Sequence, residues 1–81
     1  MHYTYLIKSK IKKYCYIGST DDLKKRFKEH NQGKTKSIKH LLPFELIYYE
    51  AYKTKFLARK RELELKKNSL KKKELLDRIE T

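Results

Sequence analysis

The sequence contains little cysteine, no tryptophan and no long hydrophobic run. Its single cysteine, Cys15, excludes an internal disulfide and a cysteine-rich metal site. No apolar segment approaches the roughly 20 residues that a membrane-spanning helix needs, and no signal peptide precedes the first expected strand. The lack of tryptophan, with tyrosine placed in strand-like segments, also fits a membrane-surface helix poorly. We therefore expect a cytoplasmic protein with no membrane partner.

Acidic residues are outnumbered throughout the chain. The 22 lysines and arginines exceed the 10 acidic residues and give a formal net charge of +12 at pH 7. Residues 1–54 carry 12 basic and 5 acidic residues, and residues 55–81 carry 10 and 5, so no separate basic tail exists. A field of this kind attracts polyanions, of which nucleic acid is the commonest inside cells. A surface kept soluble by lysine is the alternative interpretation.

The length of the chain leaves room for one modest core, so we expect one domain, residues 1–81. Segments rich in tyrosine, isoleucine and threonine predict strands, and segments with helical periodicity predict helices. The expected elements are strands at 3–9 and 14–19, a helix ending near 31, a basic loop at 34–42, a strand at about 44–52, and helices at 55–67 and 70–79. This order, β-β-α-β-α-α, predicts an α+β fold with a small antiparallel sheet against helices. The first two strands must be antiparallel because their connection is too short for a crossover.

The first predicted helix carries two polar side chains on its apolar face. Thr20, followed by two aspartates at the positive end of the helix dipole, is expected to cap this helix. At about 100° per residue, Arg26 and His30 fall on the same stripe as Leu23 and Phe27. The structural alternative places the Arg26 stem along the edge of the core and makes His30 a hydrogen-bonded core histidine.

The second predicted helix places a carboxylate on its apolar side. Glu62 falls inside the arc that contains Ala58 and Leu65. A carboxylate on an apolar face is costly unless it is paired or bound to a metal. Arg59 and Lys66, three residues before and four after Glu62, offer the structural alternative of a local ion-pair ladder.

Together these residues resemble the GIY-YIG nuclease family, in particular its small stand-alone members related to the N-terminal nuclease domain of excinuclease. The first family motif corresponds to Tyr3-Thr4-Tyr5 and the second to Tyr16-Ile17-Gly18. The other corresponding positions are Ser19-Thr20, Leu23, Arg26, His30-Asn31, Gly33, Pro43, Leu46 to Glu50, Ala58, Glu62 and Lys66.

The chain departs from the family pattern at a few positions. Tyr3-Thr4 replaces the Gly-Ile of the first motif, and Leu57 replaces an acidic residue at a position that we place on the solvent side. Ile38 stands about where relatives have a loop threonine, and Leu41-Leu42 stand where they often have arginine. If that loop contacts the substrate, these replacements weaken its hold on phosphate.

The resemblance implies a three-stranded antiparallel sheet flanked by helices and an endonuclease that hydrolyses phosphodiester bonds. It makes Tyr5 and Tyr16 the active-site tyrosines, Arg26 and His30 the site residues of the first helix, and Glu62 the metal ligand. A single Mg²⁺ or Mn²⁺ would lie on Glu62, with phosphate and water completing its shell. Arg26 would grip the phosphate through its guanidinium.

The general base is left open between two side chains. Tyr5, helped by Tyr16, is one candidate, and cationic surroundings are expected to lower its pKa from about 10. His30 is the other candidate, and its unperturbed pKa suits a base better.

The expected partner is nucleic acid, with DNA favoured over RNA, recognised by structure more than by sequence, as in DNA repair. Protein–protein contact is expected to be limited, leaving a monomer or a weak dimer. Five lysines are candidate phosphate contacts: Lys24, Lys34, Lys36, Lys39 and Lys66. The alternatives to an enzyme are a non-catalytic nucleic-acid-binding module on the same fold and a protein-interaction adaptor with solvating lysines.

Overall fold

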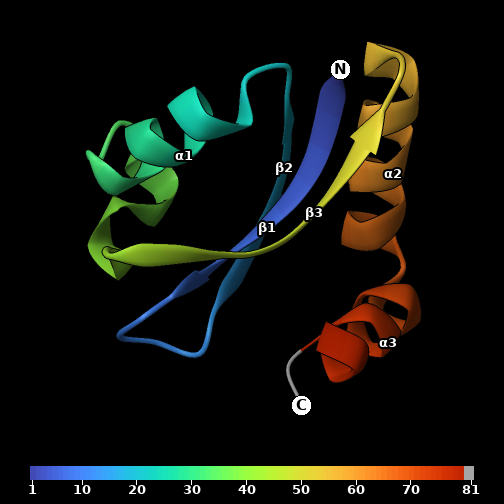
Figure 1. Ribbon diagram of the computed structural model, residues 1–81. Coiled ribbons are helices and arrows are strands. Elements are labelled where there is room, and N and C mark those ends of the chain that lie inside the picture. The colour runs from blue at the N-terminus through green and yellow to red at the C-terminus, as the bar shows by residue number, and fades with distance from the viewer. Residues whose placement is uncertain (80–81) are drawn as a thin grey trace.

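Three antiparallel strands run through the middle of the molecule, with helices on either side (Figure 1). The structure is a computed structural model that describes residues 1–79. The last two residues of the expected domain, 80–81, therefore lie outside the described part. The strands are β1 (His2–Ser9), β2 (Cys15–Thr20) and β3 (Phe44–Tyr52), in the spatial order β2-β1-β3. The helices are α1 (Leu23–Asn31), the 3₁₀ helix η1 (Lys36–Leu41), α2 (Lys55–Lys67) and α3 (Ser69–Ile79).

Strand β1 is central and pairs with both neighbours. In the hairpin with β2, Tyr5 stands opposite Gly18, and on the other side Tyr5 stands opposite Tyr49 of β3. The order and type of the elements confirm the predicted β-β-α-β-α-α arrangement and the three-stranded antiparallel sheet.

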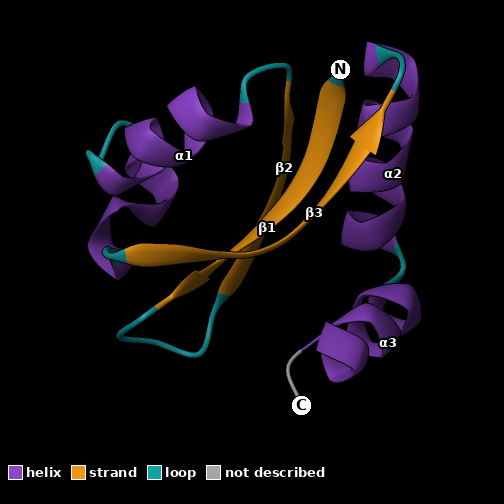
Figure 2. Ribbon diagram, in the orientation of Figure 1, coloured by secondary structure: helices purple, strands orange, loops and turns teal. Residues whose placement is uncertain are grey.

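The two faces of the sheet carry separate cores, because successive side chains of a strand point to opposite sides. Helix α1 lies on one side of the sheet, and α2 and α3 lie on the other (Figure 2). On the α1 side, Tyr5 and Ile7 pack with residues from η1 and β3; on the other side, Leu6 packs with residues from α2 and α3. The buried members of the first core are Tyr5, Ile7, Ile38, Leu41 and Phe44, and those of the second are Leu6, Ile17, Leu65 and Leu75.

The cap of α1 is Asp22, not Thr20 as predicted. The Asp22 carboxylate accepts a hydrogen bond from the backbone N–H of Lys25 at 3.1 Å. Thr20 is the last residue of β2 and pairs with Tyr3, so the chain has not yet turned into the helix at that position. The Thr20 hydroxyl instead accepts from the backbone N–H of Asp22 at 3.1 Å and stabilises the turn.

The expected basic loop at 34–42 contains the 3₁₀ helix η1. Ile38 and Leu41 are its buried residues, and they complete the core on the α1 side. The apolar residues at positions 38 and 41, where relatives have polar ones, are therefore explained by packing in this core.

Within residues 1–79, no helix is long and apolar enough to cross a membrane.

Candidate active site

Gly18 of β2 allows the Tyr5 ring to lie directly over the sheet. A Cβ atom at position 18 would stand 2.4 Å from the Tyr5 hydroxyl oxygen and 2.6 Å from the ring carbon that bears it. Both distances are shorter than real Cβ atoms show, so any side chain at this position displaces the ring. The glycine of the second tripeptide motif is thus required by the tyrosine of the first.

The Tyr5 hydroxyl meets His30 on α1. The hydroxyl oxygen lies 2.7 Å from His30 Nε2, and the Thr35 hydroxyl lies 2.9 Å from His30 Nδ1. Tyr5 and His30 are each 1% exposed. Both ring nitrogens therefore have a partner, and in a neutral imidazole one of them donates while the other accepts.

Burial shifts the pKa values of this pair in opposite directions. It raises the pKa of Tyr5 to about 12, and the Arg26 guanidinium only partly offsets the rise. Burial, helped by the positive charge of Arg26, lowers the pKa of His30 to about 4. Arg26 lowers the Tyr5 pKa, as expected of cationic surroundings, but desolvation outweighs the arginine and the net shift is upward. At neutral pH the pair is an uncharged phenol on an uncharged imidazole.

Tyr16 of β2 lies between the Tyr5–His30 pair and Lys66 of α2. Its ring packs edge-on to His30, with ring centroids 5.1 Å apart. The Lys66 ammonium of α2 lies 5.7 Å from the centroid of the Tyr16 ring. Because Tyr16 packs on the α1-side core and Ile17 belongs to the opposite core, side chains from both faces meet at this edge.

Glu62 points inward from α2 and is 3% exposed. Its Oε1 accepts from the Ser19 hydroxyl at 2.6 Å, and its Oε2 accepts from the Lys66 ammonium at 2.6 Å. Arg59 forms a third contact, at 3.2 Å from Oε1. Burial alone would raise the pKa of Glu62, but Lys66, Ser19 and Arg59 together hold it below its ordinary value. The carboxylate is therefore ionised at neutral pH.

The oxygen atoms around Glu62 suit a hard divalent cation held by few protein ligands. Residues 1–79 contain no cluster of three or more histidine, cysteine or acidic side chains that could bind a metal. One ionised carboxylate beside the Ser19 hydroxyl is nonetheless a set that Mg²⁺ accepts, because this ion keeps several waters and binds substrate phosphate. The side chains of Arg59 and Lys66 are 61% and 42% exposed, so both have room to move away from the carboxylate.

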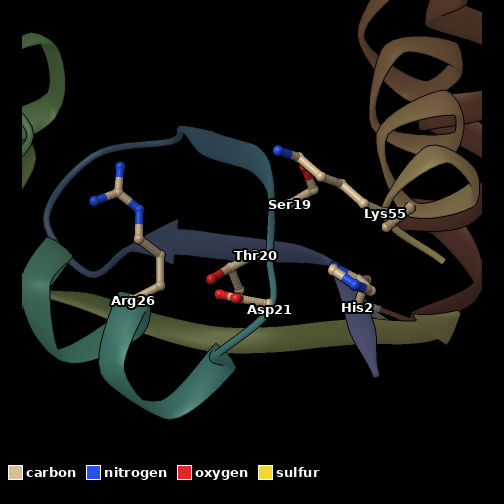
Figure 3. Close-up of a pocket in the computed structure, with 7 residues that line it drawn as sticks. His2, Ser19, Thr20, Asp21, Arg26 and Lys55 are labelled. Atoms are coloured by element: carbon tan, nitrogen blue, oxygen red, sulfur yellow. The ribbon is translucent and has the colours of Figure 1, made fainter. Parts of the chain in front are cut away.

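A pocket of about 300 Å³ lies between α1 and the start of α2. Figure 3 shows Arg26 on one side of the pocket and Lys55 with His2 on the other. Ser19, whose hydroxyl binds Glu62, also lines it. Arg26 makes an ion pair with Glu29 at 3.3 Å, and its side chain is 35% exposed. Two cations and the Ser19 hydroxyl therefore border one cavity.

The structure thus brings together the five predicted site residues around the β2 edge: Tyr5, Tyr16, Arg26, His30 and Glu62. The five candidate phosphate-binding lysines are all exposed, and of these Lys66 contacts the cluster: Lys24, Lys34, Lys36, Lys39 and Lys66. The sequence did not predict a site role for Thr35, Ser19 or Lys55. Of these, Thr35 could have been noticed, because it is a hydroxyl-bearing residue within a lysine-rich segment.

A comparison with known protein families identifies the family of this chain. Residues 1–75 match the family described as GIY-YIG catalytic domain. The chain belongs to the GIY-YIG family. The predicted GIY-YIG nuclease family is confirmed.

Three relatives show how far the similarity extends. The chain is 45% identical over 75 residues to UPF0213 protein YazA of Bacillus subtilis, covering 91% of this chain and 75% of that protein. It is 41% identical over 73 residues to UPF0213 protein SSP2268 of Staphylococcus saprophyticus, covering 89% and 88%. It is 38% identical over 74 residues to UPF0213 protein SpyM3_1077 of Streptococcus pyogenes, covering 90% and 79%. No solved structure matches the chain.

Proposed function

We propose that this GIY-YIG protein is a divalent-metal-dependent endonuclease that hydrolyses phosphodiester bonds of nucleic acid, DNA in preference to RNA. The observation that carries the proposal is the ionised, 3% exposed Glu62 carboxylate, bound by the Ser19 hydroxyl, which itself lines a pocket bordered by Arg26 and Lys55. A carboxylate linked through Ser19 to a pocket in which two cations face one carboxylate, that of Asp21, suits a site where a metal ion and a phosphate meet.

Glu62 would hold the metal, with the Ser19 hydroxyl orienting the carboxylate or sharing the ion. We propose Mg²⁺ or Mn²⁺, because an oxygen donor set favours hard cations. A bound divalent ion supplies Lewis-acid stabilisation of the charge that develops on the phosphate. Arg59 and Lys66 would neutralise the carboxylate until the ion arrives, since both contact its oxygens.

Tyr5 and His30 would handle the proton of the attacking water. Because the pKa of the Tyr5 phenol is about 12, almost none of it is ionised at neutral pH, so Tyr5 is a poor base on its own. A neutral Tyr5 that donates to Nε2 of a neutral His30 forms a relay: the phenol oxygen takes the proton of water while its own proton passes to the imidazole. In this arrangement Nδ1 of His30 donates to Thr35, across the 2.9 Å contact.

Arg26 would bind the scissile phosphate. Its guanidinium is always charged and presents a planar fork to phosphate oxygens. The positive charge of Arg26 acts on both Tyr5 and His30, which places it next to the proposed relay. Tyr16, between His30 and Lys66, would position the ring of His30 and face the substrate.

The test is one incubation of the purified protein with labelled single-stranded, duplex and flap DNA and RNA, with and without Mg²⁺ and Mn²⁺. Glu62→Gln keeps the shape and removes the charge, so it should abolish metal-dependent cleavage. Glu64→Gln, on the same helix, is the matched control and should cleave normally. Cleavage by Glu62→Gln at the wild-type rate would overturn the metal role.

A second candidate, a nucleic-acid-binding module without catalysis, is favoured by the ion pairs that already satisfy Glu62. In that case, wild-type protein would bind the substrates with a steep salt dependence and cut none of them. An interaction adaptor would bind none of them.

A further inference from the structure

Two tyrosines form an aromatic surface on the α1 side of the sheet. Tyr49 of β3 is 53% exposed, and its ring meets the ring of Tyr3 edge-on with centroids 6.0 Å apart. We call Tyr3 and Tyr49 the tyrosine platform. Because the Tyr49 ring is half exposed and lies on an edge strand, it can offer its surface to a planar ligand.

A hollow of about 480 Å³ lies against this platform. Its apolar wall is made by Leu23 and Phe27 of α1 and Leu46 of β3, beside the two tyrosines. The hollow is thus a cleft between the first turns of α1 and the edge strand.

The polar side chains that line the hollow favour a base over a phosphate as its occupant. Asp21 and Asp22 line it beside one cation, Lys24, whereas the Arg26 pocket has one carboxylate beside two cations, so a phosphate is less favoured in the hollow than in that pocket. The same carboxylates can accept hydrogen bonds from the amino groups of adenine, cytosine or guanine. Lys24 also lines the hollow and is exposed, so it can meet the phosphate that follows the base.

The platform adjoins the proposed active site. Tyr49 is the direct cross-strand partner of Tyr5, which puts their Cβ atoms only about 5 Å apart on the same face. Asp21 lines both this hollow and the pocket that contains Arg26. A strand with a phosphate in that pocket can therefore place a neighbouring base on the platform.

We propose that the tyrosine platform stacks one unpaired base of the substrate strand, next to the phosphate that is cleaved. The inference rests on the proposed function, and it names the substrate class: single-stranded nucleic acid or a duplex with an unpaired segment at the cut. Aromatic rings beside cationic side chains are the usual means of holding such strands. A base inside a duplex has first to be unstacked, at a cost of a few kcal/mol, so fully paired DNA binds less well.

The chain contains no tryptophan, so Tyr49→Trp introduces a single indole reporter at the platform. Its fluorescence is measured during titration with a single-stranded oligonucleotide, with the same oligonucleotide made of abasic sites, and with a duplex. Stacking predicts quenching and tight binding with the base-containing strand and a much weaker response with the other two. Equal quenching by the abasic strand would overturn the proposal, because phosphate alone would then explain the signal.

Tyr49→Leu tests the affinity without a reporter. It should lower the affinity for the single strand roughly 5- to 150-fold, the loss expected for one stacked base. Tyr49→Phe should retain the affinity, since it keeps the ring. Tyr14, which is 40% exposed at the far end of the hairpin, provides the control: Tyr14→Leu should have no effect. Unfolding temperatures confirm that each variant is folded.

The outcomes separate this inference from the nuclease proposal. Base-dependent binding that Tyr49→Leu removes, in a protein that cuts nothing, supports the platform and refutes the nuclease. Normal cleavage and affinity in Tyr49→Leu refute the platform and leave the nuclease intact. If Tyr49→Leu loses affinity for the abasic strand as well, the platform is not a base site.

Discussion

The Tyr5 hydroxyl and His30 Nε2 lie 2.7 Å apart in the interior, although the two residues are 25 positions apart in the sequence. Burial disfavours the charged form of each group, which is why the pKa of Tyr5 rises and that of His30 falls. Two uncharged partners joined by a hydrogen bond cost little to bury. The pair can therefore remain in the core at rest and still exchange a proton when charge develops beside it.

The first prediction concerns the charge of His30. Its ring should stay neutral on acidification until the pH approaches its pKa of about 4, well below the ordinary value of 6.5. Between pH 6.5 and 4 the unfolded chain binds more protons than the folded chain, so this histidine makes stability fall as the pH falls. NMR titration of the ring measures the pKa directly. His30→Gln should flatten the pH dependence of the unfolding temperature in this window. Titration near 6.5 in the wild type would contradict the burial argument.

The second prediction concerns Gly18. In Gly18→Ala the new methyl group must push the Tyr5 ring away, because a Cβ atom there would stand 2.4 Å from the phenol oxygen. We expect a stability loss of about 1–3 kcal/mol from overpacking and the loss of the Tyr5–His30 contact. The proposed nuclease activity should fall with it. Gly33→Ala is the control, since it strains a backbone with φ of +76° and its Cβ would meet Lys39 and Leu42 instead of Tyr5, so it should cost stability without displacing the Tyr5 ring. An unshifted Tyr5 ring signal in Gly18→Ala would refute the prediction.

Much of the fold could be predicted because local signals agree with it. The tyrosine- and isoleucine-rich segments indicated the hairpin, and helical periodicity placed Arg26, His30 and Glu62 on inward faces, where His30 and Glu62 are buried and Arg26 is partly buried. The cap of α1 was missed because Thr20 and Asp22 are both good capping residues, and only the length of β2 decides between them.

Contacts between distant segments could not be read from the sequence. The steric link between Gly18 and Tyr5 depends on the strand register. The contact from Thr35 to His30 depends on how the chain turns after α1. The lowering effect of Arg26 on the Tyr5 pKa was predicted, but the larger opposing effect of burial was not, because charge is visible in a sequence whereas the depth of burial is set by packing.

The third prediction concerns a carboxylate outside the proposed site. Glu50 of β3 accepts hydrogen bonds from Tyr48, Tyr52 and Arg61, and Arg61 binds both of its oxygens, at 2.9 and 3.2 Å. Burial raises the pKa of Glu50, but these partners outweigh it and lower the pKa below 4.5. Its contribution to stability is therefore present above pH 4.5 and is lost as the pH falls through the lowered value.

Glu50→Gln should consequently destabilise the protein by about 1–3 kcal/mol at pH 7, since it leaves Arg61 with a poorer partner. The deficit relative to wild type should shrink in acid, where Glu50 itself becomes protonated. Chemical denaturation at pH 7 and below pH 4 measures both values. Glu45→Gln, at an exposed position of the same strand, should have little effect at either pH. A deficit that is the same at the two pH values would contradict the role of the charge.

The fourth prediction concerns Lys66 and metal affinity. The Lys66 ammonium occupies Glu62 Oε2 at 2.6 Å, where it competes with the proposed cation for the same oxygen. Lys66→Met removes the competitor, so Mn²⁺ should bind roughly two- to fivefold more tightly, the equivalent of a partly exposed ion pair of up to about 1 kcal/mol. Isothermal titration calorimetry with Mn²⁺ alone, without substrate, measures this change independently of cleavage. Lys67→Met, at the next position, should leave the affinity unchanged and controls for the lost charge on the domain. Weaker Mn²⁺ binding in Lys66→Met alone would mean that the lysine orients the carboxylate for the ion and does not compete with it.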